Sequence, residues 1–241
     1  MHFDKKGNNP TLAVGFLFKG LKLVSRPELR KFIIIPVLIN IVLYSVALAL
    51  SYFYIADLID QFIPGWLLWL SWILWPLFFI SFFIGGFFTF TVLANLLASP
   101  FYGHLAAKTL AISSGEPVTL AEPPLAKVIW GELKRMGYLV TRALPLLIIS
   151  FIPGLNVIAP VLWALFGAWG MALEYLAYPL ENQGVLFSEQ KDLVKSIRLG
   201  ALSFGGLAVL GLAIPLLNLI IAPAAVIGAT LYLHEIKRDP D

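Results

Sequence analysis

Four basic residues lie in the short segment that precedes the first long uncharged stretch of the chain. The segment, residues 20–32, reads GLKLVSRPELRKF and carries Lys22, Arg26, Arg30 and Lys31. Basic residues at the cytoplasmic end of a membrane helix contact anionic lipid, whereas a convergent group of them binds a small anion. These residue types leave two interpretations open, a lipid anchor and an anion-binding site.

The same segment has the sequence signals of a helix N-terminus. Ser25 and Glu28 have the spacing of a capping box, and Pro27 falls in the first turn that would follow. The free N–H groups and partial positive charge of a helix start favour an anion, and Arg30 and Lys31 add full charges close by. Glu28 opposes this interpretation, because its carboxylate competes for the same N–H groups.

A second group of ionisable residues precedes another uncharged stretch. Glu132, Arg135 and Arg142 are spaced i, i+3 and i+10, so on a helix they fall within about 80° of one another. Ionisable groups at membrane depth usually face the protein interior or a cavity, although a solvated cytoplasmic face would show the same spacing. Glu174 is the only acid of the apolar run that follows. We expect it to be interfacial; a proton-exchanging carboxylate is the alternative.

The sequence lacks the residues that several classes of chemistry require. The chain has no cysteine, which excludes disulfides and thiol chemistry, and its three histidines form no HExxH motif. No GxxxxGK[ST] loop is present, so a P-loop nucleotide site is excluded, and no serine, histidine and acid stand in a hydrolase context. We therefore expect that the protein is not an enzyme, that it holds no metal and no cofactor, and that it has no nucleic-acid partner.

The composition is that of a membrane protein. Hydrophobic residues make up 59% of the 241 and charged residues 13%, about half the charged share of an ordinary domain. Residues 32–56 are uncharged and, at roughly 1.5 Å per residue, can cross a hydrocarbon core of about 30 Å. A second uncharged run, 62–107, predicts a helix over about 69–97, which residues 99–103 then break or bend.

Residues 11–24 also have a helical pattern. Val14, Leu17, Phe18 and Leu21 fall on one face, which is typical of a helix lying in the membrane interface. The turn between this helix and the first membrane helix would then form a basic pocket at the membrane edge.

An internal repeat lies in the second half of the chain. IPGLNVIAP, residues 152–160, matches IPLLNLIIAP, residues 214–223, with one extra residue in the second copy. Each copy sits in the middle of an uncharged run and follows a basic amphipathic segment. We interpret the copies as two related helical hairpins; chance similarity within an apolar background is the alternative.

The arms of these hairpins are short. The first apolar arm, residues 143–152, gives roughly 15 Å of helix and the arms of the second roughly 23 Å, both less than the hydrocarbon thickness of about 30 Å. We therefore expect re-entrant hairpins, with two complete spanning pairs as the alternative. A broken backbone at mid-depth requires protein or a water-filled cavity around it, so Asn156 and Asn218 are expected beside a pathway.

The placement of charge predicts the topology. All lysines and arginines lie in the polar stretches, whereas the turn between the first two long runs has Asp57 and Asp60 and no base. By the positive-inside rule, the N-terminus, the middle region and the C-terminus are cytoplasmic. The predicted fold class is an all-α integral membrane protein with two long transmembrane helices, two shorter re-entrant helical hairpins and an N-terminal interfacial helix.

We expect a single membrane domain over residues 1–241. Its parts are an interfacial helix and basic turn (11–31), two long transmembrane helices (32–107), an amphipathic helix with the first hairpin (108–180), and the second hairpin with the C-terminal tail (181–241).

Five stretches together resemble the CysZ family of bacterial sulfate permeases. They occur in order from about Gly20 to Thr230 and read GLKLVSRPELRKFIIIPVLIN, ASPFYGHLA, FIPGLNVIAPVLWALFGAW, YPLEN and IPLLNLIIAPAAVIGAT. The resemblance implies sulfate uptake across the bacterial inner membrane for cysteine biosynthesis. It also implies a multi-pass fold with two long transmembrane helices, two pairs of partly penetrating helices and a homo-oligomeric assembly.

The resemblance further implies that sulfate binds in the segment before the first long helix. The matching positions are Gly20, Leu21, Ser25, Pro27, Arg30 and Lys31. The second arginine of the family pattern is a lysine here; lysine keeps the charge but lacks the planar fork of arginine, a loss for which Arg26 can compensate. The charged core of the family corresponds to Glu132, Arg135 and Arg142. We expect these three, with Asn156 and Asn218, to line a polar path.

We therefore predict a channel-like sulfate permease whose partners are sulfate, membrane lipid and further copies of the chain. Arginines lower the cost of moving a dianion through a low-dielectric site. Because no nucleotide motif is present, flux is passive or coupled to an ion gradient. The alternative function is a membrane scaffold or assembly factor whose basic flanks serve only as anchors. A lipid-modifying enzyme would need acids, histidines or serines clustered at one depth, and the sequence has no such cluster.

Overall fold

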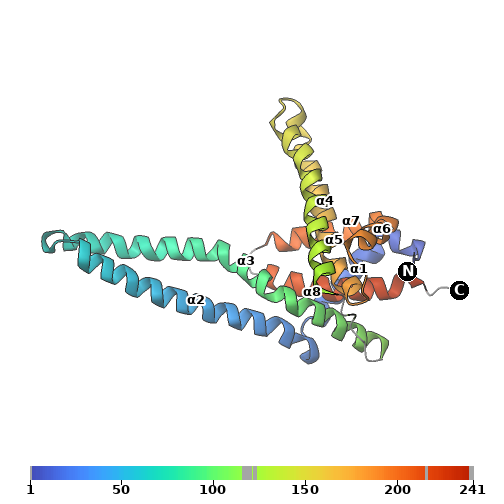
Figure 1. The fold of residues 1–241 in the computed structure, drawn as a ribbon, viewed down its shortest axis with the longest axis horizontal. Helices are drawn as coiled ribbons and strands as arrows, with labels where there is room; N and C mark the ends of the chain where they lie inside the picture. The colour runs from blue at the N-terminus through green and yellow to red at the C-terminus, as the bar shows by residue number, and fades with distance from the viewer. Residues whose placement is uncertain (1, 116–120, 122–123, 215–216, 239–241) are drawn as a thin grey trace. The chain divides into compact units, whose positions relative to one another are not determined.

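The computed structural model is all-α apart from one pair of two-residue strands, and it describes residues 2–115, 121, 124–214 and 217–238. Figure 1 shows the elements in order. The helices are α1 (Pro10–Leu23), α2 (Pro27–Phe62), α3 (Ser71–Ser114), α4 (Leu125–Phe151), α5 (Ala159–Glu181), α6 (Phe187–Ser196), α7 (Arg198–Leu212) and α8 (Asn218–Ile236), with short 3-10 turns η1 (Lys5–Asn8), η2 (Gly65–Leu70) and η3 (Leu155–Val157). Strands β1 (His2–Phe3) and β2 (Lys237–Arg238) pair antiparallel.

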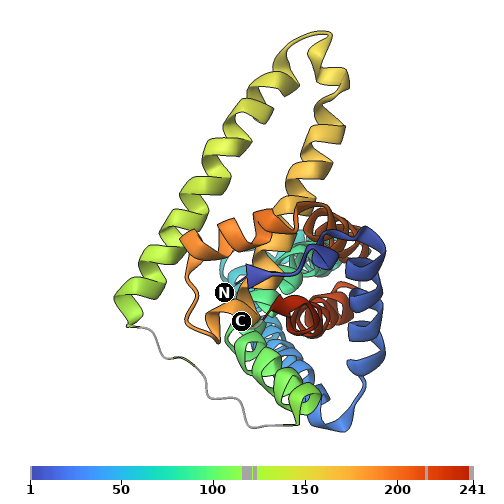
Figure 2. The same ribbon diagram turned by 90° about the vertical axis from the view of Figure 1, so that its right-hand side faces the viewer.

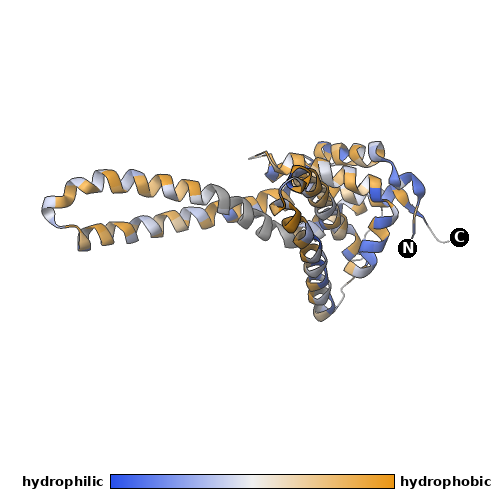
Figure 3. Ribbon diagram, turned by 90° about the horizontal axis from the view of Figure 1, so that it is seen from above, coloured by the Kyte–Doolittle hydropathy of each residue, from blue (hydrophilic) through white to orange (hydrophobic). Residues whose placement is uncertain are grey.

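The chain divides into two compact units, one of residues 32–99 and one of residues 1–31 with 100–241. In the first, α2 and α3 are joined through η2 and lie against each other through a Tyr44–Thr89 hydroxyl hydrogen bond and ring contact of Tyr52 with Trp75 at 4.7 Å. Hydrophobic residues predominate along both helices (Figure 3), and many of their side chains are exposed, for example Trp72 at 84%. Apolar side chains so exposed on long helices require lipid as their solvent.

The second long helix continues further than the sequence predicts. We expected residues 99–103 to break or bend it, but α3 is one element, Ser71–Ser114, and this expectation is wrong about a break. Tyr102, Leu105 and Ala106 lie on one face of α3 and are buried against the protein, so packing favours continuation of the helix past the proline. The division between the two compact units nevertheless falls in this segment, between residues 99 and 100.

Small residues allow the helices of the larger unit to pack closely. Helix α1 contacts α7 and α8, and α5 contacts α7 and α8 (Figure 2). A Cβ added at Gly20 would overlap the Ala224 carbonyl oxygen of α8, and one at Gly205 of α7 would overlap the Ala168 carbonyl oxygen of α5. Such contacts between backbones hold apolar helices together where lipid competes equally well for larger side chains.

We expect Gly20→Ala to destabilise the protein by about 1–3 kcal/mol, because the added methyl group must displace the backbone of α8. The matched control is Gly15→Ala on the same helix, where a Cβ meets nothing within 4 Å and alanine improves helix propensity by about 1 kcal/mol. Thermal unfolding of both variants in detergent measures the difference. Equal melting temperatures would show that α1 does not depend on close contact with α8.

Helix α1 is buried along one side. Ala13, Phe16, Leu17 and Gly20 face the protein, whereas Phe18, which we assigned to the apolar face of an interfacial helix, is 51% exposed. An exposed phenylalanine on an interfacial helix can contact lipid, so the interfacial position of α1 stays a prediction. On the buried side, Gly20 allows the backbones of α1 and α8 to approach closely.

Both copies of the internal repeat connect two helices that contact each other, so the predicted hairpins are present. In the first copy, Gly154 has φ +85° and the chain turns through η3 from α4 into α5. The second copy joins α7 to α8, and its Pro215 lies outside the described residues. Pro160 stands in the first turn of α5, whereas the corresponding Pro223 lies inside α8.

Four helical segments of the described residues are long and apolar enough to cross a membrane. They are Pro27–Ile59, Gly65–Gly86, Ala159–Glu181 and Asn218–Ile236. Helices α6 and α7 meet at a bend of 104° and together form one further candidate. The structure is therefore that of an all-α membrane protein, as the composition predicts.

Candidate functional site

The basic turn between α1 and α2 is built differently from the predicted capping box. Helix α2 begins at Pro27, and the backbone N–H groups of Leu29 and Arg30 both donate to the Arg26 carbonyl oxygen. The Ser25 hydroxyl instead donates to the Lys22 carbonyl oxygen at 3.4 Å. The prediction was one residue early, because Pro27 at the first helical position makes Arg26 the residue that precedes the helix.

A pocket of about 210 Å³ adjoins this turn. Arg26 is the basic residue among its lining side chains, and Thr109 and Ser113 from the end of α3 add hydroxyl groups. Leu23, Leu29, Ile112 and Leu231 form the apolar remainder. The pocket therefore combines one guanidinium, two hydroxyls and an apolar wall, which suits a small oxyanion that is partly removed from water.

The other residues predicted at this site lie outside the pocket lining. Arg30 and Lys31 are exposed in the first turns of α2, Leu21 is half-buried, and Gly20 is buried against α8. Gly20 thus has a packing reason to be glycine, independent of any ligand. From the sequence we expected Arg26 to compensate for the lysine that replaces the second arginine of the family pattern, at Lys31. In the structure Arg26 is the basic residue that lines the pocket.

Arg135 on α4 is the centre of a separate cluster of charged side chains. Its Nη1 lies 3.3 Å from a Glu174 carboxylate oxygen and 3.4 Å from one of Glu132, and its Nη2 lies 2.9 Å from one of Glu181. The Arg135 side chain is only 9% exposed, whereas the three carboxylates are 34–47% exposed. One guanidinium therefore ties α4 to α5 through acids that keep part of their hydration.

Neutral groups complete this cluster. Arg135 Nη2 also donates to Gln190 Oε1 of α6 at 3.2 Å, and Gln190 Nε2 donates to the Val185 carbonyl oxygen at 2.8 Å and to Glu181 at 3.3 Å. The Tyr178 hydroxyl donates to Glu174 at 3.1 Å. Buried Arg135 Nε has no hydrogen-bond partner among the described residues. The cluster joins α4, α5 and α6 and holds more negative than positive charge.

The sequence identified only part of this cluster. Glu132 and Arg135 meet as their spacing predicts, but Arg142 lies apart, exposed, with its guanidinium 3.6 Å over the Tyr138 ring and bonded to the Tyr138 carbonyl oxygen. Sequence reasoning missed Glu181 and Gln190. Glu174 and Glu181 are seven residues apart on α5, so they share a helix face, and this spacing was the available signal.

The two asparagines of the repeat occupy unlike positions. Asn156 is exposed in η3, at the turn of the first hairpin, whereas Asn218 is buried at the start of α8. Equivalent residues of the two copies therefore face different surroundings. Among the described residues, no group of three or more histidine, aspartate or glutamate side chains is arranged to hold a metal ion.

Burial raises the pKa of the Glu132 carboxyl above its usual range; Arg135 opposes this shift, and the Glu181 and Glu174 carboxylates add to it. A carboxyl whose pKa is raised on folding stabilises the folded state fully below its unfolded pKa, and the contribution is lost as pH rises through the folded value. Because the glutamine of Glu132→Gln cannot ionise, this variant should not lose stability as the pH rises.

We therefore expect the melting temperature of Glu132→Gln to rise relative to wild type as the pH increases above about 4, the pKa of a glutamate in the unfolded chain. Thermal unfolding in detergent at several pH values measures this difference. A difference that is constant with pH would mean that Glu132 ionises as freely in the folded protein as in the unfolded chain.

The exposed apolar helices define an all-α, multi-pass membrane protein. It also has a basic turn beside a pocket and a cluster of one arginine with three carboxylates. The chain belongs to the family described as Sulfate transporter CysZ/Etoposide-induced protein 2.4, whose model matches residues 16–223. The family resemblance identified in the sequence is confirmed, and the description names a transporter rather than an enzyme.

Curated relatives match over most of their length. A sulfate transporter CysZ of Pseudomonas syringae pv. tomato is 42% identical over 230 residues, covering 90% of this chain and 89% of the relative. One from Pseudomonas aeruginosa strain LESB58 is 38% identical over 226 residues, covering 90% and 92%. One from Pectobacterium atrosepticum is 37% identical over 242 residues, covering 95% and 88%.

Proposed function

We propose that this protein transports sulfate across the bacterial inner membrane and supplies sulfur for cysteine biosynthesis. The observation that carries the proposal is its identity of 37–42% with proteins named sulfate transporter CysZ, over at least nine-tenths of the chain. The four apolar helices long enough to cross a membrane support the multi-pass location.

Sulfate binds, in this proposal, at the basic turn between α1 and α2. The site comprises Gly20, Leu21, Ser25, Arg26, Pro27, Arg30 and Lys31. The pocket beside Arg26 supports it, because the guanidinium and the Ser113 hydroxyl can donate to a dianion, whereas the Thr109 hydroxyl already donates to the Leu105 carbonyl oxygen. The exposed side chains of Arg30 and Lys31 attract sulfate from solution to this site.

Glu132, Arg135, Arg142, Asn156 and Asn218 line the onward path in the same proposal. Arg135 is paired with three carboxylates, so it can contact sulfate only when sulfate replaces one of them. Arg142 and Asn156 are exposed in the single chain. Because an exposed polar side chain within the hydrocarbon region is costly, the exposure of Asn156 at the turn supports a homo-oligomer in which a second copy and water enclose it.

Both hairpins remain re-entrant in this proposal. Helix α5 extends roughly 23 Å from its start to Glu174. Helix α4 extends roughly 14 Å from Arg142 to its end. With the charged residues near the cytoplasmic interface, the turn stops short of a hydrocarbon core of about 30 Å.

Accessibility of the turn tests this topology. The chain has no cysteine, so Leu155→Cys and Leu217→Cys each introduce a single thiol, and we expect neither to react with a membrane-impermeant maleimide added from the periplasm. Gln61→Cys is the matched control, because the turn after α2 is expected on that side and Gln61 is exposed. Labelling of Leu155→Cys or Leu217→Cys as fast as that of Gln61→Cys would favour full crossings.

Sulfate flux itself tests the function. Purified protein in liposomes should take up radiolabelled sulfate faster than protein-free liposomes, and excess unlabelled sulfate should suppress the signal. Uptake equal to that of protein-free liposomes would overturn the proposal in favour of a non-transporting scaffold.

A further inference from the structure

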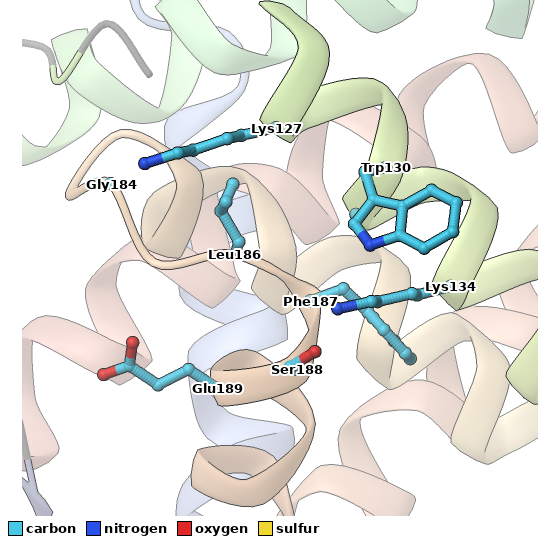
Figure 4. Close-up of a pocket in the computed structure, with 9 residues that line it drawn as sticks. Lys127, Trp130, Lys134, Gly184, Leu186, Phe187, Ser188 and Glu189 are labelled. Atoms are coloured by element: carbon cyan, nitrogen blue, oxygen red, sulfur yellow. The ribbon is translucent and has the colours of Figure 1, made fainter. Parts of the chain in front are cut away.

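A second pocket, of about 320 Å³, lies between α4 and the start of α6. Figure 4 shows its lining: one wall consists of Lys127, Trp130, Gly131 and Lys134 of α4. The other wall consists of Gly184, Leu186, Phe187, Ser188 and Glu189. This pocket shares no lining residue with the one beside Arg26, and the proposed transport function does not use it.

The two lysines give this pocket a positive charge. Lys127 and Lys134 are seven residues apart, so both project from the same face of α4. Neither forms an ion pair with a residue that the structure describes; the Lys134 ammonium group lies 5.7 Å from the centre of the Trp130 ring. Two ammonium groups that no carboxylate neutralises favour an anion in the space between them.

The opposite wall supplies neutral donors. The hydroxyl of Ser188 lies at the pocket, and in Figure 4 the Lys134 ammonium group points toward it. The ten-residue helix α6 begins here after Leu186, which provides no side-chain cap. The N–H groups of Glu189 and Gln190 donate to the Leu186 carbonyl oxygen, which leaves those of Phe187 and Ser188 as the N–H groups of the helix start without a partner in the helix. Glu189 is the one acid of the lining; Figure 4 shows its carboxylate turned away from Lys134.

We propose that this pocket binds a tetrahedral oxyanion at Lys134 and the hydroxyl of Ser188, with Lys127 adding positive charge at the other end of the pocket, where Figure 4 shows its ammonium group beside Gly184. Phospholipid phosphate and free inorganic phosphate or sulfate share the required chemistry. The surroundings bring lipid within reach, because Trp130 and Met136 on α4 are 60% and 62% exposed, and tryptophan prefers the depth of lipid headgroups. The lysine pair is the part of the site that carries the affinity.

The test compares two sources of the oxyanion on the full chain in detergent. Thermal unfolding is followed while dihexanoyl phosphatidylglycerol, dihexanoyl phosphatidylcholine, inorganic phosphate or sulfate is added. We expect at least one of these to raise the melting temperature of the wild type. Lys127→Gln with Lys134→Gln should weaken that binding about tenfold or more, since each lost charge-assisted contact is substantial.

Two controls make the result specific. Lys191→Gln with Lys195→Gln removes the same charge from α6 outside the pocket, and both of these lysines face Asp192; it should bind as the wild type does. Arg26→Ala removes the proposed sulfate site, so any oxyanion effect that survives it belongs elsewhere.

Each outcome is decisive. A response to phosphatidylglycerol alone that is lost with Lys127 and Lys134 identifies a lipid phosphate site. A response to inorganic anions that survives Arg26→Ala and is lost with Lys127 and Lys134 identifies a free-anion site. A response that the Lys127 and Lys134 substitutions leave unchanged, or that both lysine pairs weaken equally, would overturn the proposal, as would the absence of any response.

Discussion

Replacement of Arg135 by methionine is expected to destabilise the protein by about 2–3 kcal/mol. Methionine fills a similar volume but leaves three carboxylates together without a cation. Removing one partner of a buried ion pair costs about 3–5 kcal/mol. The expected value is smaller here because the carboxylates are 34–47% exposed and water screens them. In a chain of this size the melting temperature should fall by roughly 5–10 °C.

Arg142→Met is the matched control for this experiment. Arg142 lies on the same helix, is exposed, and donates to the Tyr138 carbonyl oxygen while stacking on the Tyr138 ring. Its loss should cost no more than about 1 kcal/mol. A second variant, Arg135→Met with Glu181→Gln, should recover part of the lost stability because one repelling charge is removed. If Arg135→Met melted at the temperature of Arg142→Met, the cluster would not stabilise the fold.

Arg26→Ala is expected to weaken sulfate binding about tenfold or more, because a charge-assisted hydrogen bond contributes about 1.5–3 kcal/mol. Arg26 is the basic residue that lines the pocket beside the turn. Sulfate affinity is measured by titration calorimetry in detergent, and uptake into liposomes is measured in parallel. The loss of affinity should be steeper at low ionic strength, where charge also speeds encounter.

Lys22→Ala is the control for Arg26→Ala, since Lys22 is exposed on the preceding helix turn and does not line the pocket. The double variant Arg30→Ala with Lys31→Ala tests the part of the site that the sequence placed on the helix start. We expect a smaller loss from this variant than from Arg26→Ala. If only the double variant lost affinity, sulfate would bind on the α2 surface instead of in the pocket, and unchanged affinity in both would remove the site.

The segments of the fold followed from the sequence because each depends on local pattern. Uncharged runs of sufficient length predicted α2 and most of α3, and the repeated Ile-Pro and Leu-Asn pairs predicted the two hairpins. Their ends were harder to place. Helix α3 continues through residues 99–103, where Tyr102, Leu105 and Ala106 pack one face of it against the protein, a tertiary contact that proline and serine do not encode.

The candidate site shows the same division. Basic residues and Pro27 marked the turn, but only the fold brought Arg26 against Thr109 and Ser113, more than eighty positions further along the chain. Glu132 and Arg135 were predictable neighbours because a helix fixes residues three apart. Glu181 and Gln190 joined them through the packing of α5 and α6 on α4, which no local rule specifies.

The sequence by itself thus determined the all-α membrane class, the family and the helical hairpins, because hydrophobic length, charge placement and ordered motifs act over neighbouring residues. Only the tertiary structure decided which side chains meet. Gly20 faces α8 while Phe18 is exposed, and Arg135 is enclosed by carboxylates while Arg142 is not. The reason is that these contacts form between helices that lie far apart in the chain. Close packing depends on the shapes of the facing side chains, and ion pairing depends on the distance between the charged groups.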